Sequence, residues 1–399
     1  MIDRPPCYLH DLGILSTLGH DKESVRAGLM QGDTRGMVVE SGWHPTKSMR
    51  VGRVSAPLPE ITGALAIYRC RSNQLLLAAA RQIAPAIDAA IQRFGRERVG
   101  IVIGTSTSGI AEGEAAMAAH ARDGAFPRDF HYRQQEMGTP ARFLAEALAI
   151  DGPAYVVSTA CTSGAKALAS ARLLLWNESC DAVVVGGVDS LCGLTLNGFA
   201  ALELTTSDLC NPMSANRHGI NIGEGAAIFL MSLDPAPLAL LGVGESSDAY
   251  HISAPDPAGA GAEIAMRAAL ADAQISSEQV AYVNLHGTAT RHNDSMEAAA
   301  LARVFDSTVP CSSTKALTGH ALGAAGAIEA GFCWLTLSEE NRVGALPPHV
   351  WDGARDPTFP SLALTDATAR LPRERPRLLA SNSFAFGGNN ICLVIGDGS

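Results

Sequence analysis

The amino-acid sequence predicts a layered α/β fold, in which helices cover both faces of a mostly buried sheet. Short apolar runs recur with helical stretches between them, at residues 98–104, 154–157, 181–188, 227–233, 281–287 and 390–396. Because these runs are apolar almost throughout and do not alternate with polar residues, they are typical of strands covered on both faces. Residues 73–94 are predicted to form one covering helix, with a kink at Pro85.

A weak internal repeat indicates that the fold is duplicated. The segment VGIVIGTSTSG (99–109) resembles AYVNLHGTATR (281–291), and STACTSGAKALASARLLL (158–175) resembles STKALTGHALGAAGAIEAGFCWLTL (313–337). The two copies are separated near LDPAPLALLG, where two prolines follow a predicted strand. We therefore expect one half over residues 1–235 and the other over residues 236–399.

Composition limits the class of protein. The chain has 399 residues, of which 47% are hydrophobic and 18% charged, a balance that indicates a globular protein with a large core. Its formal charge of -10 argues against a nucleic-acid partner. The opening MIDRPPCYLHDLG lacks the pattern of a secretory signal, and no apolar run reaches membrane-spanning length. We expect a cytoplasmic protein without a membrane span.

Nine cysteines are scattered along the chain, without CxxC pairs or closely spaced Cys/His clusters. This pattern argues against a disulfide framework and against a zinc site, so most of these cysteines are expected to be small buried hydrophobes. Cys161 is the candidate exception. It lies between small residues where a strand gives way to a helix, and the free N–H groups of a helix start would lower its pKa. The alternative is a buried structural cysteine.

Three further segments carry candidate chemistry. In VNLHGTATRHNDSME (283–297), His286 ends a predicted strand, although a lone histidine there can be structural. In SSTKALTGHALGAAGAIEA (312–330), Lys315 and His320 lie five residues apart at the start of a helix, where a lysine is ordinarily on the surface. SNSFAFGGNN (381–390) is a glycine-rich turn, which by itself fits a hairpin connection.

Together these segments match, in order and spacing, the condensing enzymes of fatty acid and polyketide synthesis. The chain resembles a β-ketoacyl-[acyl carrier protein] synthase of the type I/II group, within the thiolase superfamily. In that family a cysteine after TA opens a buried helix, a histidine precedes GT, a lysine precedes GH, and a Phe-Gly-rich turn closes the site. The resemblance covers nearly the whole chain and implies a thiolase-like duplicated five-layer αβαβα fold.

Two motifs depart from the family pattern. The usual HGTGTxxGDPxE is HGTATRHNDSME here, and FGFGGTN is FAFGGNN. These changes put the acyl or pantetheine preference in doubt. The departing residues are Ala289, Asn293, Ser295, Ala385 and Asn389.

Other branches of the superfamily fit less well, because thiolases use a second cysteine and type III condensing enzymes a Cys-His-Asn set. A rival of another class is the non-catalytic chain-length factor, a partner subunit that keeps the fold. Such a subunit usually loses the nucleophile, so Cys161 disfavours this alternative.

The resemblance implies a decarboxylating Claisen condensation of an acyl thioester with malonyl-[acyl carrier protein], in fatty acid or polyketide/aryl polyene biosynthesis, without a metal or organic cofactor. Cys161 would be the nucleophile, and the backbone N–H groups of Cys161 and Phe386 would form the oxyanion hole. His286 and His320 would each donate a hydrogen bond to the enolate, and Lys315 would stay charged beside them.

Further roles follow from the resemblance. Thr288 and Thr290 would contact pantetheine, and Phe199 and Phe386 would line or gate the acyl channel, although an aromatic residue is more often plain core. Glu329 would balance Lys315 or form an ordinary helix salt bridge. The turn would be shaped by Gly387 and Gly388.

The expected partners are acyl carrier protein and a second subunit, either a copy of this chain or a chain-length-factor-like protein. Thr107, in the GTSTSG loop, would close the acyl pocket across that interface and leave room for medium or long acyl groups. Arg69 and Arg71 would meet the acidic carrier protein, or else form a solvated charge pair.

Overall fold

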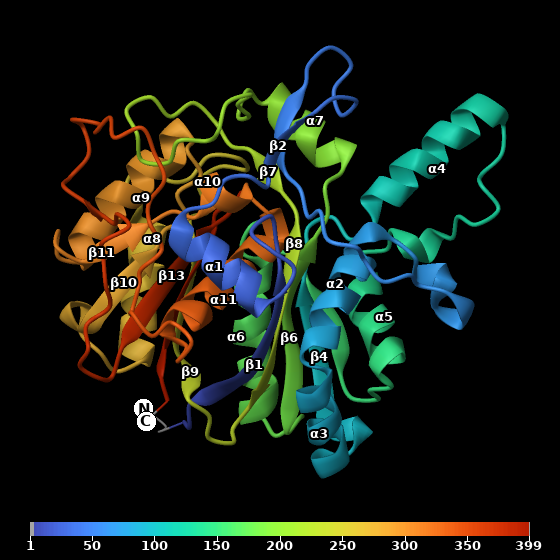
Figure 1. Ribbon diagram of the computed structural model, residues 1–399, viewed down its shortest axis with the longest axis horizontal. Coiled ribbons are helices and arrows are strands. Elements are labelled where there is room, and N and C mark those ends of the chain that lie inside the picture. The colour runs from blue at the N-terminus through green and yellow to red at the C-terminus, as the bar shows by residue number, and fades with distance from the viewer. Residues whose placement is uncertain (1–3, 399) are drawn as a thin grey trace.

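The structure, a computed structural model, describes residues 4–398 (Figure 1). Its main feature is a mixed sheet of 11 strands. One half of this sheet runs in the order β1-β8-β6-β4-β5, in which β4 pairs in parallel with β5 and β6, and β8 pairs antiparallel with β6 and β1. The strands are β1 (Cys7–Leu15), β4 (Val99–Gly104), β5 (Ala154–Val157), β6 (Ala182–Asp189) and β8 (Gly225–Ser232).

The other half repeats this order and these directions as β9-β14-β13-β10-β11, with β12 (Ala363–Leu364) added at its edge. A short antiparallel contact between β1 and β9 joins the two halves. The expected duplication is therefore present in strand order and direction. The strands are β9 (Leu238–Ser247), β10 (Val280–Asn284), β11 (Pro310–Ser312), β13 (Leu378–Phe384) and β14 (Asn389–Asp397).

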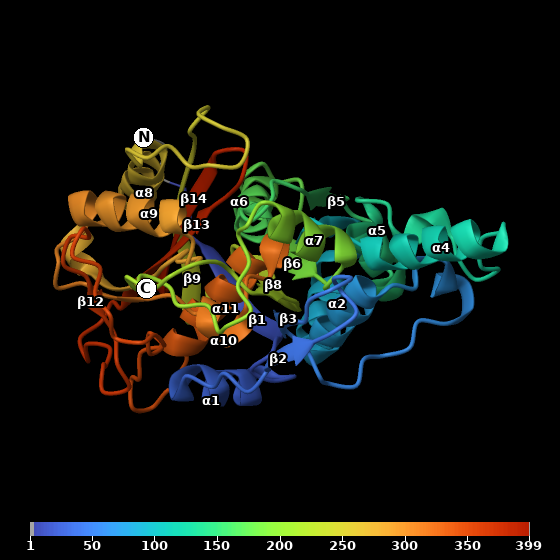
Figure 2. The ribbon, with the colours of Figure 1, turned by 90° about the horizontal axis from the view of Figure 1, so that it is seen from above.

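The helices form three layers, one on the outer side of each half-sheet and one between the two half-sheets. Figure 2 shows α8 (Ala260–Asp272) and α9 (Arg291–Val304) at one end, and α2 (Arg71–Gln82) and α5 (Thr139–Leu148) at the other. Between the half-sheets, α6 (Ser163–Trp176) packs on α11 (Ala325–Leu337). This arrangement is the predicted thiolase-like five-layer αβαβα fold. The expected division near residue 235 lies between β8 and β9; as a domain boundary it stays a prediction.

Smaller elements complete the chain. A second sheet is made of β2 (Met37–Glu40), β3 (Met49–Gly52) and β7 (Ile222–Gly223). In Figure 1, α4 (Ile110–Asp123) projects from the side that carries α2 and α5. Within residues 4–398, no helix combines the length and the apolar character needed to cross a membrane. The remaining helices are α1 (Lys22–Gln31), α3 (Ala84–Phe94), α7 (Gly193–Ala201) and α10 (Lys315–Thr318).

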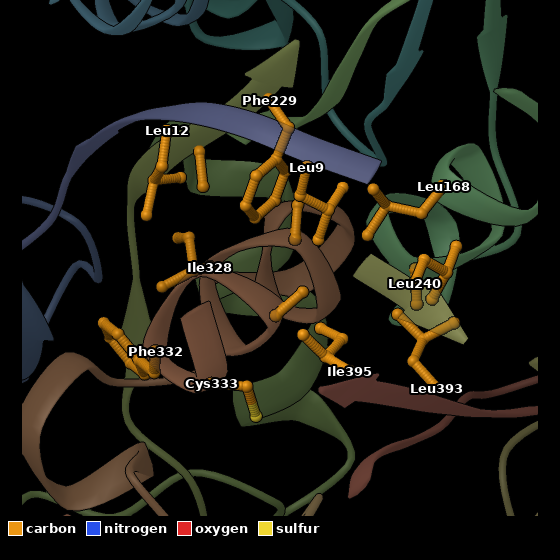
Figure 3. Close-up of a cluster of buried hydrophobic side chains, with 14 of the residues drawn as sticks. Leu9, Leu12, Leu168, Phe229, Leu240, Ile328, Phe332, Cys333, Leu393 and Ile395 are labelled. Atoms are coloured by element: carbon orange, nitrogen blue, oxygen red, sulfur yellow. The ribbon is translucent and has the colours of Figure 1, made fainter. Parts of the chain in front are cut away.

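The core is centred on α11, which is buried along almost its whole length. Figure 3 shows its side chains Ile328 and Phe332 surrounded by apolar side chains from β1, β8, β9, β14 and α6. A helix that is apolar on every face has to be enclosed on every face. The two half-sheets and α6 provide that enclosure.

Glycines allow α6 and α11 to approach closely. A Cβ atom on Gly164 would lie 2.7 Å from the backbone nitrogen of Ala327, and one on Gly326 would lie 2.8 Å from the Cβ of Ala165. Real Cβ atoms do not come this close to backbone atoms, so neither helix tolerates a larger residue there without moving.

The structure corrects some expected elements. Residues 73–94 are not one kinked helix: α2 ends at Gln82, α3 begins at Ala84, and Pro85 lies in the first turn of α3, a position that suits proline. β10 ends at Asn284, so His286 lies in the loop after the strand. The sequence analysis missed β1 and β9, which contain glycine and polar residues among the apolar ones. It also missed the short strands β11 and β12, and β13, whose last four residues it placed in the turn 381–390.

We predict opposite effects for two helical glycines. Gly164→Ala should lower the free energy of unfolding by about 1–3 kcal/mol, because the new methyl group collides with the backbone of α11. Gly198→Ala, on α7, meets no atom within 4 Å and should raise it by about 1 kcal/mol through helix propensity alone. Urea unfolding of both variants tests this. Equal effects would contradict close packing of α6 on α11.

Candidate active site

A cleft opens where β5, β10 and β13 end. The sequence-predicted residues that line it come from segments far apart in the chain. They are Cys161, Phe199, His286, Thr288, Thr290, His320 and Phe386. β10 and β13 are neighbouring parallel strands, so the loops at their carboxyl ends meet at one edge of the sheet. Cys161 comes from the other half-sheet and is brought to these loops by the contact between α6 and α11.

Cys161 lies on a tight turn between β5 and α6. The preceding residue, Ala160, has a φ of 53°, a left-handed conformation that is uncommon without glycine. The Ser163 hydroxyl donates to the Ala160 carbonyl (2.6 Å) and accepts from the Thr159 N–H (2.9 Å). This turn holds the Cys161 side chain at the floor of the cleft, where it is 5% exposed.

Two histidines face Cys161 from the other half of the molecule. His320 lies between α10 and α11, and its Nε2 is 3.0 Å from Cys161 Sγ. The His286 and His320 rings meet edge to face, with their centroids 5.3 Å apart. One atom of each of the three side chains lies within 4.8 Å of the others. The structure thus brings the predicted Cys-His-His set together.

The expected low pKa of Cys161 is wrong. Burial raises the pKa of the thiol to about 11, although Lys315 and hydrogen bonds from the backbone N–H groups of Phe386 and Cys161 lower it. Cys161 precedes α6, which begins at Ser163, and the loss of water around a buried sulfur outweighs the favourable field of the helix start.

Both histidines are neutral near pH 7. Burial lowers the pKa of His286 and of His320 well below the usual value, and the charge of Lys315 lowers both further. Nδ1 of each ring is buried without a hydrogen-bond partner. Since a buried N–H without a partner is costlier than a bare nitrogen, we infer that each ring carries its proton on Nε2. Each can then donate one hydrogen bond.

Lys315 is a buried residue, and its ammonium group is held on two sides. Nζ donates to the His286 carbonyl (2.8 Å) and pairs with the Glu329 carboxylate on α11. The ordinary alternative of a surface lysine is therefore excluded. Burial raises the pKa of Glu329, while Lys315 lowers it. The pair stabilises both buried charges and ties the His286 loop to the central helix layer.

The Cys-His-His set also offers three donor atoms suited to a metal ion. The buried ammonium group of Lys315 acts against a cation at this position, since its charge already lowers the pKa of both imidazoles. The positive field instead favours an anion that accepts hydrogen bonds from the two rings. This arrangement suits an oxyanion or an enolate.

Two carboxylates shape the loop that carries His286. Glu297 on α9 accepts from the N–H groups of His286 (2.8 Å) and Gly287 (2.7 Å). Asp294 accepts from the N–H of Ala289, whose φ is 65°. Both carboxylates belong to the HGTATRHNDSME motif, but the sequence analysis assigned them no role; their spacing to His286 is the signal that could have found it.

Thr288, Thr290, Phe199 and Phe386 line the cleft as expected, and their ligand contacts stay predictions. The two threonine hydroxyls are 3.0 Å apart, and the two phenylalanine rings are 5.3 Å apart. The Phe386 N–H lowers the pKa of the Cys161 thiol.

The glycine-rich turn follows Phe386 directly in the chain. Gly387 and Gly388 have φ angles of 81° and 76°, values that glycine adopts readily. The turn is held by bonds from the Gly387 N–H to the Ile252 carbonyl and from the Asp248 N–H to the Gly388 carbonyl, each 2.8 Å long. The same turn joins the antiparallel strands β13 and β14, so the alternative interpretation, a hairpin connection, is also correct.

Two expected contacts are not found in this chain. The Thr107 side chain does not line the cleft: it is 1% exposed and donates to Asp189 (2.7 Å), so its role toward a partner subunit stays a prediction. Arg71 is not part of an exposed charge pair: its half-buried side chain pairs with the fully buried Glu224, and its role in docking stays a prediction. Arg69 pairs with Asp129 at the surface.

The sequence analysis missed several lining residues, including Leu204, Ile220, Ser253 and Pro255. They lie in loops that no motif marks. Only the way the chain folds around the cleft brings them to Cys161.

Comparisons with known proteins agree with this geometry. Residues 70–236 match the family model described as beta-ketoacyl synthase, N-terminal domain, and residues 239–350 match the corresponding C-terminal domain. The chain is 32% identical to Nodulation protein E of Rhizobium meliloti (strain 1021), over 96% of this chain and 97% of that protein. It is also 32% identical to 3-oxoacyl-[acyl-carrier-protein] synthase 2 of Staphylococcus aureus, over 81% of this chain and 83% of that protein.

Solved structures give the same result. A chain of the ketosynthase (ApeO) in complex with its chain length factor (ApeC), from Xenorhabdus doucetiae, superposes with a TM-score of 0.93 at 44% identity, covering 100% of both chains. A chain of the ishigamide ketosynthase/chain length factor superposes with a TM-score of 0.86 at 26% identity, covering 99% of both chains. Fold, cleft and sequence matches over both halves lead to one conclusion: this chain belongs to the beta-ketoacyl synthase family.

Proposed function

We propose that this chain catalyses the decarboxylating condensation of an acyl thioester with malonyl-[acyl carrier protein], giving 3-oxoacyl-[acyl carrier protein]. The observation that carries the proposal is the buried Cys161, in contact with His320 and beside His286, under the positive field of Lys315. A binding subunit without catalysis needs none of these groups. The same chemistry serves fatty acid or polyketide synthesis.

In the first step, Cys161 attacks the carbonyl carbon of the acyl thioester. A C–S bond to Cys161 forms, the bond to the carrier's sulfur breaks, and the proton lost by Cys161 ends on the departing thiol. The backbone N–H groups of Cys161 and Phe386, which both lower the pKa of the Cys161 thiol, then donate to the oxygen that becomes negative.

In the second step, malonyl-carrier protein enters the cleft and loses carbon dioxide. The electron pair of the broken C–C bond passes into an enolate, whose oxygen accepts hydrogen bonds from Nε2–H of His286 and His320. The enolate carbon then attacks the acyl carbonyl carbon, the C–S bond to Cys161 breaks, and the sulfur leaves as a thiolate that takes up a proton from water. Lys315 supplies positive charge next to both rings throughout.

We propose carrier protein as the donor of both thioesters, and a dimer as the working form. Support comes from the names of relatives: one is a 3-oxoacyl-[acyl-carrier-protein] synthase, and two solved relatives are complexes of a ketosynthase with a chain length factor. The second subunit is then a copy of this chain or a chain-length-factor-like protein. Native mass spectrometry of the purified chain distinguishes the two.

The raised pKa of Cys161 predicts a pH dependence. Because the thiolate fraction grows until pH reaches a pKa of about 11, alkylation of Cys161 by iodoacetamide should rise about tenfold per pH unit from neutral pH to about pH 10. Peptide mass analysis of the Cys161 adduct measures this rate. A plateau near neutral pH would mean that the thiolate already dominates there.

Removal of the nucleophile gives a further prediction. Cys161→Ala should abolish both the acyl adduct and condensation, because the nearby imidazoles have no comparable reactivity toward thioesters. Intact mass after incubation with acyl-carrier protein tests this, with Cys180→Ala, another buried cysteine, as the control that keeps the adduct. An unmodified wild-type chain would favour the chain-length-factor alternative.

Another prediction separates the two steps. His286→Ala and His320→Ala should each slow carbon dioxide release from labelled malonyl-carrier protein by about 10²- to 10³-fold, the usual effect of losing one oxyanion donor. Acylation of Cys161 should persist in both variants. His218→Ala, which changes an exposed histidine outside the cleft, is the control. Undiminished release in either variant contradicts the assigned role of that histidine.

A further inference from the structure

Asp189, the last residue of β6, is a fully buried carboxylate that pairs with neutral groups. It accepts hydrogen bonds from five donors, all of them hydroxyl or backbone N–H groups. The donors are Thr105 Oγ1 (2.6 Å), Ser106 N (3.0 Å), Thr107 N (2.9 Å), Thr107 Oγ1 (2.7 Å) and Gly323 N (2.6 Å). A buried carboxylate is costly to keep, and the mechanism above does not use it.

One oxygen of Asp189 reaches the nucleophile's turn. Oδ1 holds the loop after β4 through Thr105 and Thr107, and the Ser106 hydroxyl of that loop donates to the Ala160 carbonyl (3.1 Å). Ala160 is the left-handed residue that precedes Cys161. The negative charge of Asp189 also raises the pKa of the Cys161 thiol, which is consistent with this short separation.

The other oxygen reaches the histidine's turn. Oδ2 accepts from the N–H of Gly323, three residues after His320. A Cβ atom on Gly323 would lie 2.6 Å from the nitrogen of Ser106 and 2.7 Å from Oδ2 of Asp189. The His320 turn therefore packs directly against Asp189 and Ser106. The two turns belong to different halves of the molecule. The Asp189 carboxylate accepts hydrogen bonds from both halves, from the loop after β4 and from Gly323.

We propose that Asp189 is a positioning residue, which fixes His320 relative to Cys161 for the decarboxylation step. This inference rests on the proposed function. It follows from the chain of contacts from Ala160 through Ser106 and Asp189 to Gly323, with the 3.0 Å contact between Cys161 Sγ and His320 Nε2 as its result.

The variant Asp189→Asn should keep the hydrogen bonds on the Cys161 side and remove the one on the His320 side. The amide oxygen can replace Oδ1, which has the larger set of donors, while the amide NH₂ then faces the Gly323 N–H and cannot accept from it. We expect decarboxylation to fall about 100-fold and Cys161 acylation to stay within about twofold of wild type, since small displacements of a catalytic group have effects of this size.

Gly323→Ala disturbs the same contact from the opposite side and should give the same selective loss. Asp397→Asn is the matched control: it changes a buried carboxylate at the far end of β14 and should leave the ratio of the two half-reactions unchanged. Both half-reactions are measured on folded protein, with labelled carbon dioxide release and intact mass. Equal loss in both half-reactions, or no loss in either, would overturn the positioning role.

A separate readout keeps this inference distinct from the proposed function. If the wild-type chain releases no carbon dioxide, the proposed function fails, and the positioning role is then judged by a crystal structure of the Asp189→Asn protein. Separation of Cys161 Sγ from His320 Nε2 beyond hydrogen-bonding distance supports the role. Retention of the native 3.0 Å contact overturns it.

Discussion

The close contact between α6 and α11 is the constraint on which the rest of the structure depends. Gly164 and Gly326 let the two helix starts meet almost backbone to backbone. Cys161 lies just before α6 and His320 just before α11, so this contact places a thiol from one half beside an imidazole from the other. Glu329, on the same α11, holds Lys315 under the His286 loop.

Burial then determines the chemistry of the site. The same loss of water makes the imidazoles neutral and raises the pKa of the thiol. A neutral ring donates a hydrogen bond and keeps its proton, whereas a protonated ring is a stronger acid and gives its proton up more readily. The thiol, by contrast, is protonated near neutral pH, which limits oxidation and alkylation of this buried sulfur.

Much of this arrangement could be predicted from the sequence. The motifs around Cys161, His286, Lys315 and His320 are each continuous in the sequence, and their match to the condensing enzymes indicated which side chains meet. Several strands followed from apolar runs, but β1, β9, β11 and β13 did not, because packing in the finished sheet, and not their composition, decides their conformation.

Properties that depend on distant atoms could not be predicted. The pKa of Cys161 depends on how completely other segments exclude water, and a local argument from the helix start gave the wrong sign. Likewise, the pairing of Arg71 with Glu224 joins residues 153 positions apart, and no pattern near Arg71 indicates it. Lining residues such as Leu204 and Ile220 are further examples.

The repeated strand order has a consequence for how this site divides its labour. Each half contains a connection from a strand to a central helix, from β5 to α6 in one copy and from β11 through α10 to α11 in the other. In the proposed reaction, the first connection presents the thiol that would carry the acyl chain, and the second presents the ammonium and imidazole that would stabilise negative charge. Duplication thus let one backbone geometry specialise twice, so that neither half on its own contains a complete reaction centre.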